Sequence, residues 1–229
     1  MKQLIAISAL LVGIGGMSAN AAGINKTTER VNEAVRVVGE IMEAPDKSIP
    51  VELLANAHCV AIIPSMKRGG FVVGAHYGKG VVSCRGADGK GWTPPSTVRM
   101  EGGSFGFQIG GSATDIVLLV MNERGAEKLM QSEFTLGADA SVAAGPVGRS
   151  VDAETDALFH AKILAYSRSR GVFAGAVLEG QTLRSDDSDN RELYGRSVKH
   201  EDILQGRVAA PPSTFTLINT LNRYSRQES

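Results

Sequence analysis

The chain has 229 residues and carries 24 basic and 24 acidic side chains, so its formal net charge at pH 7 is zero. Bulk charge therefore attracts neither nucleic acid nor an anionic membrane, and any anion-binding site must be a local patch. Hydrophobic residues make up 43% of the chain, and a domain of about 200 residues commonly holds a single core. These values favour one globular domain and exclude a generally basic, nucleic-acid-binding protein.

Residues 1–21 have the features of a secretory signal peptide. Lys2 gives a charged start, an apolar stretch runs from Leu4 to Val12, and Ala19-Asn20-Ala21 forms a small-residue cleavage site. The apolar run is shorter than the roughly 20 residues that span a bilayer, and no cysteine follows it to carry a lipid anchor. We expect an exported protein that is periplasmic, associated with the outer membrane or secreted, and that contacts membranes only peripherally.

An amphipathic helix is predicted within residues 22–47. Apolar side chains follow helical spacing from Val31 to Met42, with Thr27 or Thr28 as the N-cap and Ala44-Pro45 as the stop. The polar face mixes glutamates with arginines, whereas helices that lie on membranes usually display lysine and arginine. Two roles stay open for this helix, namely packing on the domain and insertion into lipid.

From residue 59 onwards the pattern becomes that of extended strands separated by turns. Tyr77-Gly78-Lys79-Gly80 is predicted to form a tight hairpin, and residues 86–91 a longer turn. The predicted fold class is a β-rich α+β single domain, with a strongly bent or barrel-like, mostly antiparallel sheet covered by several helices. The predicted strands are Cys59–Ile63, Phe71–Tyr77, Gly80–Cys84, Ile116–Met121, Ala138–Ala143, Ala161–Ser169 and Gly171–Leu183, and the later helices start near Ser48 or lie within Glu123–Gln131, Leu193–Gly206 and Phe215–Tyr224.

Cys59 and Cys84 are the only cysteines of the chain. In an oxidising compartment a disulfide between them is the first expectation. The alternatives are two free buried thiols, or a zinc site that also uses His58 and His76, although the short Cys-x-x-Cys spacing of known zinc sites is missing. No metal site and no cofactor are predicted.

Three motifs contain hydroxyl or acidic side chains of the kind found in catalytic or metal sites, and none of them predicts catalysis. Residues 102–106 match the G-x-S-x-G nucleophile elbow of hydrolases, but an elbow leads straight into a helix and the following residues are poor helix formers. Ser104 is therefore interpreted as a turn residue, and no enzyme activity is predicted. Asp186 to Glu192 lack the positions of a calcium loop and are interpreted as a solvated loop with helix caps. Asp115 is expected to hold a turn through backbone amides.

Basic residues gather around two glycine-containing segments. Lys67 and Arg68 precede Gly69-Gly70, and Lys79 lies in the predicted hairpin with Arg85 nearby if the strands pair. On a shared rim each cation would contribute roughly 1 kcal/mol towards an anionic lipid surface, and glycine amides can cradle a phosphate. The alternative is a solvated edge that discourages strand pairing. The predicted lipid-binding residues are Lys67, Arg68, Gly69, Gly70, Lys79 and Arg85.

Several separated motifs resemble the SYLF domain family, and specifically a bacterial secreted member. The resemblance runs from about Ile49 to Pro211 and assigns residues 48–229 to the domain. The motifs are SVAAGPVGR (141–149), GVFAGAVLEG (171–180), GGFVVG (69–74), WTPPS (92–96), GFQIGGSATD (106–115), FTLGADASV (134–142) and LYG (193–195).

The resemblance implies a lipid-binding module without catalysis, because eukaryotic members bind lipids, usually phosphoinositides, and some also bind actin filaments. We therefore expect a phospholipid membrane surface with anionic, phosphoinositide-like head groups as the partner. The alternative is a protein-protein interaction or structural domain of the cell envelope, with a protein partner in the envelope or in a host. Actin enters only through the resemblance, and no nucleic-acid partner is expected.

Overall fold

The computed structural model describes residues 25–45, 48–70, 73–105, 112–146, 162–169, 172–175, 178 and 180–226. The predicted signal peptide lies outside these residues, as do parts of the motifs at 141–149 and 171–180. The described strands are β1 (Cys59–Gly70), β2 (Val73–Cys84), β3 (Ser96–Phe105), β4 (Ser112–Val120), β5 (Glu133–Thr135), β6 (Val142–Ala144), β7 (Ile163–Ser169), β8 (Val172–Gly175) and β9 (Thr182–Ser185). The described helices are α1 (Lys26–Met42), α2 (Val51–Asn56), α3 (Glu123–Leu129), α5 (Asp187–Tyr194), α6 (His200–Leu204), the 3-10 helix η1 (Pro212–Thr214) and α7 (Phe215–Tyr224).

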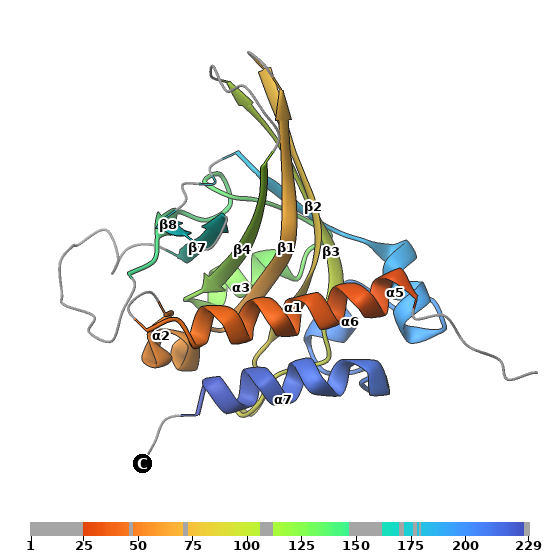
Figure 1. The fold of residues 1–229 in the computed structure, drawn as a ribbon. Helices are drawn as coiled ribbons and strands as arrows, with labels where there is room; N and C mark the ends of the chain where they lie inside the picture. The colour runs from red at the N-terminus through yellow and green to blue at the C-terminus, as the bar shows by residue number, and fades with distance from the viewer. Residues whose placement is uncertain are drawn as a thin grey trace, which may run out of the picture.

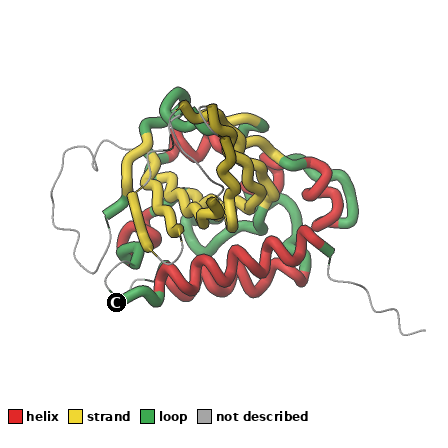
Figure 2. Tube along the Cα trace, turned by 45° about the horizontal axis from the view of Figure 1, so that its top comes forward, coloured by secondary structure: helices red, strands yellow, loops and turns green. Residues whose placement is uncertain are grey.

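The described strands form one curled sheet with the shape of a half-barrel (Figures 1 and 2). Their order is β5-β9-β3-β2-β1-β4-β7-β6, and β8 also pairs with β7. Every pair is antiparallel except β6 with β7, so β6 and β8 share one edge of β7. The predicted fold class, a bent and mostly antiparallel sheet covered by helices, is confirmed.

Both faces of the sheet are buried. Successive side chains of a strand point to opposite faces, so each central strand contributes to two apolar clusters. On β1, Cys59 and Ala61 belong to one apolar cluster and Val60 and Ile62 to the other. The first cluster is completed by α3 and β5, and the second by α1, α2 and α7. The face that carries α1 and α7 is called the helix face below.

α1 covers the helix face as a fully packed helix. Val31, Ala34 and Val37 have no exposed surface, so its apolar side is buried against the domain. Of the two roles left open for this helix, the structure has the packed one. The N-cap is Asn25, whose side chain accepts a hydrogen bond from the Thr28 amide, and the prediction of a threonine cap was wrong. Among the described helices, none combines the length and apolarity needed to cross a bilayer.

The predicted hairpin at residues 77–80 is wrong, because these residues lie in the middle of β2. A Cβ atom on Gly78 would approach Ile63 Cγ2 to 2.6 Å, and one on Gly80 would approach the carbonyl oxygen of Ile62 to 2.1 Å. These glycines allow β1 and β2 to lie close together and do not mark a turn. The two predicted strands on either side of them are therefore one strand.

The sequence pattern did not predict β3, because proline flanks its sequence and glycine interrupts it, and both residues disfavour a strand. Ser104 belongs to this strand, opposite Gly74 of β2, and its interpretation as a turn residue was wrong. The predicted strand over residues 171–183 is instead two separate strands, β8 and β9. The acidic run after β9 forms α5, with Asp186 as its N-cap. This helix begins at Asp187, six residues before the predicted helix start at Leu193 (193 − 187 = 6).

Candidate functional site

The end of the β1–β2 hairpin projects away from the helices (Figure 1). Lys67 lies opposite Tyr77 there, and Arg68 lies opposite His76. Lys67 and Tyr77 are exposed, Arg68 is half-buried, and neither basic side chain has a carboxylate partner within the described residues. We call these four residues the hairpin end. Gly69 and Gly70, also predicted to bind lipid, continue β1 beyond them, opposite Ala75 and Gly74.

A bulge in β1 sets the direction of the basic side chains. The register of β1 shifts between Ile62 and Lys67 against β2 and between Ile63 and Met66 against β4. Ser65, within this stretch, has a left-handed φ of 49°. The Ser65 amide donates a 2.8 Å hydrogen bond to Asp115 Oδ1, so the predicted role of Asp115 in holding a turn through a backbone amide is confirmed. Because an extra residue reverses the alternation of a strand, the bulge directs Lys67 towards the helix face and Arg68 towards the opposite face.

His76 is an uncompensated polar side chain of the hairpin end. Burial lowers the pKa of its imidazole, and the nearby positive charge of Arg68 lowers it further. Both ring nitrogens are buried without a hydrogen-bond partner in the described part of the chain. At neutral pH the ring is therefore uncharged, and the permanent charge of the hairpin end comes from Lys67 and Arg68.

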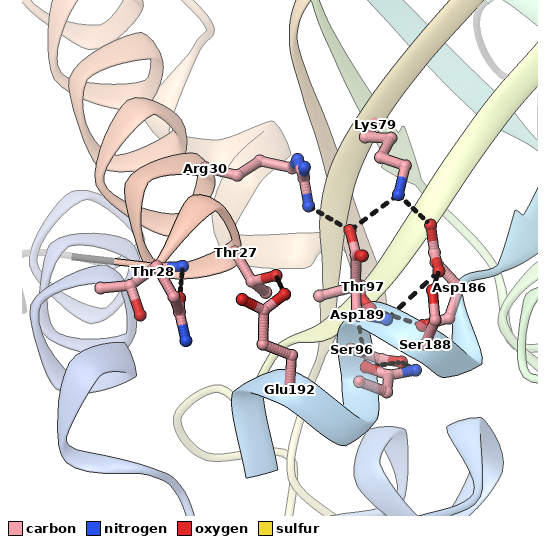
Figure 3. Close-up of polar contacts among 12 residues, drawn as sticks. Thr27, Thr28, Arg30, Lys79, Ser96, Thr97, Asp186, Ser188, Asp189 and Glu192 are labelled. Carbon is pink, nitrogen blue, oxygen red and sulfur yellow. Dashed lines mark hydrogen bonds and ion pairs between the residues drawn. The ribbon is translucent and has the colours of Figure 1, made fainter. Parts of the chain in front are cut away.

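Lys79 lies elsewhere, in a group of side chains that we call the central ion-pair cluster (Figure 3): Arg30, Lys79, Asp186 and Asp189. Its Nζ is 2.7 Å from Asp186 Oδ2 and 3.0 Å from Asp189 Oδ2, and Arg30 pairs with the same Asp189 oxygen. The cluster joins α1, β2 and the start of α5. The charge of Lys79, a predicted lipid ligand, is thus compensated inside the fold.

The pKa values of this cluster follow from its contacts. Burial opposes the charge of Lys79, but hydrogen bonds to Asp186 and Asp189 outweigh it and raise the pKa of the amine. Burial likewise opposes ionisation of Asp186, but hydrogen bonds from Lys79, Ser188 and the Asp189 amide lower the pKa of its carboxyl. Lys79 and Asp186 are therefore both ionised at neutral pH. The interpretation of residues 186–192 as a solvated loop was wrong, although Asp186 does cap a helix.

A buried serine and histidine meet below this cluster. Ser96 Oγ is 2.7 Å from His200 Nδ1, and His200 Nε2 is 3.0 Å from the carbonyl oxygen of Leu129. A carbonyl only accepts, so Nε2 carries the proton and Nδ1 accepts from the serine hydroxyl. Ser96 has no exposed surface, so this pair cannot meet a substrate in the described conformation. Its arrangement is that of a hydrogen-bonded core.

Arg85 lies at the other end of β2 from the hairpin end. Its guanidinium donates to the backbone carbonyls of Leu54, Ala55 and Ala57 at the end of α2, and it stacks 4.0 Å from the ring centre of Trp92. Eight positions separate Tyr77 from Arg85 (85 − 77 = 8), about 26 Å along a strand. The six predicted lipid-binding residues therefore do not share one rim. Lys67, Arg68, Gly69 and Gly70 stay together, and Lys79 and Arg85 lie apart from them.

The two cysteines are joined. Cys59 and Cys84 lie directly opposite each other on β1 and β2, both buried, with an S–S distance of 2.06 Å. Of the three alternatives weighed from the sequence, the structure has the disulfide, which leaves no thiolate for zinc. No group of three metal-ligating side chains gathers within the ranges that the structure describes.

The curled, mostly antiparallel sheet and its covering helices define an α+β domain, which comparison with known proteins places in a family. The family model Ysc84, described as "Las17-binding protein actin regulator", matches residues 101–224, more than half of the chain. The chain therefore belongs to this family, the SYLF domain family, as its motifs predicted.

Individual relatives agree with this assignment. "SH3 domain-containing YSC84-like protein 1" of Rattus norvegicus is 34% identical over 201 residues, which cover 85% of this chain and 58% of the relative. "Protein YSC84" of Saccharomyces cerevisiae is 37% identical over 181 residues, or 77% of this chain and 38% of the relative. "LAS seventeen-binding protein 3" of the same species is 38% identical over 181 residues, which cover 77% of this chain and 39% of the relative. The chain thus spans 38% to 58% of the length of these curated relatives.

Proposed function

We propose that this chain is an exported, non-catalytic module that associates peripherally with membranes by binding anionic phospholipid head groups at the hairpin end. The observation that carries the proposal is the pair Lys67 and Arg68, which projects from the domain without a carboxylate partner among the described residues. The exposed ring of Tyr77 beside Lys67 suits a membrane interface, because tyrosine combines an apolar body with a polar tip.

Binding of this kind is superficial. The apolar side of α1 is already buried in the domain, so this helix offers no apolar surface for insertion while it stays packed. Lys67 and Arg68 supply roughly 1 kcal/mol each near an anionic surface, and salt screens that attraction. The proposal therefore describes weak, salt-sensitive binding by electrostatic attraction.

The test is flotation with neutral and anionic vesicles at low and at physiological salt. We expect Lys67→Ala/Arg68→Ala to weaken binding to anionic vesicles roughly 30-fold at low salt, which corresponds to about 2 kcal/mol. Lys79 is left intact, because its removal would leave Asp186 without its ion-pair partner and Asp189 with Arg30 alone.

The matched control for this test is Arg191→Ala/Arg196→Ala, which removes the same charge from exposed positions in and after α5. Unchanged vesicle binding by this control, together with a loss in the hairpin-end variant, supports the proposed site. Equal binding by wild type and hairpin-end variant would remove the site assignment. No binding of the wild type to any vesicle would remove the lipid function itself.

The second candidate function is recognition of a protein partner, and the family match favours it. The matching family model is described as a Las17-binding actin regulator, and one relative is named for binding LAS seventeen. Co-sedimentation of the purified chain with actin filaments tests the actin part directly. Saturable pelleting with filaments supports it, whereas a chain that stays in the supernatant at micromolar filament concentration removes actin from the partners.

A further inference from the structure

An open cavity of about 970 Å³ lies at the corner of the domain far from the hairpin end. Three segments enclose it: the end of α2, the loop between β2 and β3, and the last turns of α7. We call it the corner pocket. Its lining residues are Ala55, Asn56, Arg85, Gly89, Lys90, Gly91, Asn219, Asn222, Arg223, Ser225 and Arg226.

The corner pocket is strongly basic, although the whole chain is neutral. Four of its eleven lining residues are basic and none is acidic. All four come from segments that the structure describes, and they belong to two parts of the chain far apart in sequence. The fold therefore concentrates positive charge here, which a ligand or partner with negative charge would compensate.

Arg85 is the fixed cation of the pocket. Its hydrogen-bond partners are neutral carbonyl oxygens, and its planar group rests on Trp92, so its position is set without any carboxylate. Burial lowers the pKa of this guanidinium, which still stays protonated. Its positive charge consequently remains uncompensated by a side chain.

The other cations lie at the surface, where they can meet a ligand. Lys90 and Arg226 are exposed, and their side chains have no ion-pair partner in the described ranges. Arg223 lies over the ring of Tyr224 and donates to its hydroxyl. Two carboxylates lie nearby outside the lining: Asp88 accepts from the Lys90 amide, and Glu43 accepts from the Tyr224 hydroxyl.

Neutral groups complete the pocket. Three asparagine side chains, Asn56, Asn219 and Asn222, offer amide donors and acceptors at its wall. Gly89 and Gly91 have left-handed φ values of 71° and 68°, and a Cβ on Gly89 would meet no atom within 4 Å. The loop backbone is therefore open to a ligand at this position. Cations, amides and an accessible glycine backbone together match the oxygen atoms of phosphate groups.

We infer that the corner pocket is a binding site for a ligand that carries two or more phosphate groups. One phosphate brings about −1.5 to −2 charges at neutral pH, so roughly two are needed to balance four cations. The volume is that of a small-molecule site, within the range of about 300–1,000 Å³. The inference does not rest on the lipid proposal, because it uses none of the hairpin-end residues. A soluble polyphosphorylated molecule and a lipid head group share this chemistry.

The test is calorimetric titration of the full chain with sodium tripolyphosphate at low and physiological salt. We expect one saturable site in the wild type, and at least about tenfold weaker binding in Lys90→Ala/Arg226→Ala, since charge-assisted hydrogen bonds are lost. These two residues are chosen because they are exposed and unpaired, so their removal leaves the fold intact. Arg85 is left in place because it binds the end of α2.

A matched variant makes the result decisive. Arg191→Ala/Arg196→Ala removes the same charge from exposed positions elsewhere and should bind tripolyphosphate as the wild type does. Equal losses in the two double variants would overturn the pocket and indicate attraction by bulk charge. Absence of binding by the wild type would also overturn it.

Vesicles with a bisphosphorylated inositol lipid distinguish the two sources of the ligand. Weaker tripolyphosphate binding with unchanged vesicle binding in Lys90→Ala/Arg226→Ala assigns the pocket to a soluble ligand. Weakening of both assigns it to the lipid head group. The hairpin-end proposal is tested separately, because it predicts weaker vesicle binding by Lys67→Ala/Arg68→Ala.

Discussion

His200 shows how a titratable residue can serve the core of this domain. It is 6% exposed, donates from Nε2 to the Leu129 carbonyl and accepts at Nδ1 from Ser96. Burial lowers the pKa of the ring, whereas the Leu129 carbonyl and the charge of Asp187 act in the opposite direction without cancelling it. The folded protein therefore favours the neutral ring.

Acid should accordingly weaken the fold through His200. At His200 the unfolded chain takes up a proton near pH 6.5, whereas the folded chain does so only at lower pH. The contribution of His200 to the free energy of unfolding is therefore fully present above about pH 6.5 and is lost as the pH falls through the folded pKa. We expect urea unfolding at about pH 7.5 and about pH 5 to show this loss, and His200→Gln to reduce it.

The control for this measurement is His58→Gln, at an exposed position, which should keep the full pH dependence. All variants are compared in a His76→Gln background, because the lowered pKa of His76 contributes in the same pH window. A His200→Gln protein with an unchanged pH dependence would contradict the assignment of the loss to His200.

Among the elements, α1 and α5 are joined by side chains that come from distant parts of the sequence. Arg30 of α1 and Lys79 of β2 share Asp189 of α5, and Thr27 of α1 donates to Glu192. The carboxylate of Asp189 is 13% exposed, so its charge is largely withdrawn from water. Pairs of this kind are costly to break, because the partners are left charged and buried.

Asp189→Ala should therefore lower the free energy of unfolding by about 3 kcal/mol, since it leaves Arg30 and Lys79 with less compensation. The matched control is Asp202→Ala, which removes an aspartate from the first turn of another helix, where it pairs with the exposed Arg207. That control should cost less than about 1 kcal/mol. Equal costs in urea unfolding would show that the cluster contributes no more than a surface pair.

Local patterns predicted the elements whose signals are local. The apolar spacing from Val31 to Met42, the segment Glu123–Gln131 and the segment Phe215–Tyr224 all correspond to helices of the structure. The same local reasoning failed at Gly78 and Gly80, because glycine is favoured both in tight turns and where two strands approach closely. Only the register of β1 against β2 separates these cases.

The candidate sites were predictable only in part, for a related reason. Lys67 and Arg68 are neighbours in sequence and stay together at the hairpin end. Lys79 and Asp189, in contrast, are 110 positions apart, and no local pattern indicates that they pair. The corner pocket also joins Lys90 to Arg226 across most of the domain, so its charge could not be recognised before the fold was known.

The whole molecule is organised around β1 and β2, which the disulfide joins at their shared end. Cys59 and Cys84 are 25 positions apart, and a bond across such a loop restricts the unfolded chain. We expect Cys59→Ala/Cys84→Ala to lower the free energy of unfolding by about 3 kcal/mol. Urea unfolding of the oxidised wild type against this variant is the measurement.

Chemical reduction of the wild type provides the companion control, because it opens the disulfide without substituting either cysteine. Both samples should keep their binding to anionic vesicles under native conditions, since strand pairing fixes the hairpin end independently of the bond. A reduced protein as stable as the oxidised one would contradict the expected contribution.

α1 and α7 pack side by side on the helix face, although the whole sheet lies between them in the sequence (Figure 1). Leu217 and Leu221 of α7 belong to the same apolar cluster as Val31 and Ile41 of α1. During synthesis α1 leaves the ribosome long before its partner, and its apolar side has no cover from α7 until residues 215–224 have followed. The contacts of α1 with β1 and β2 need only the first part of the domain, whereas the helical layer on this face is complete only after Tyr224 has emerged.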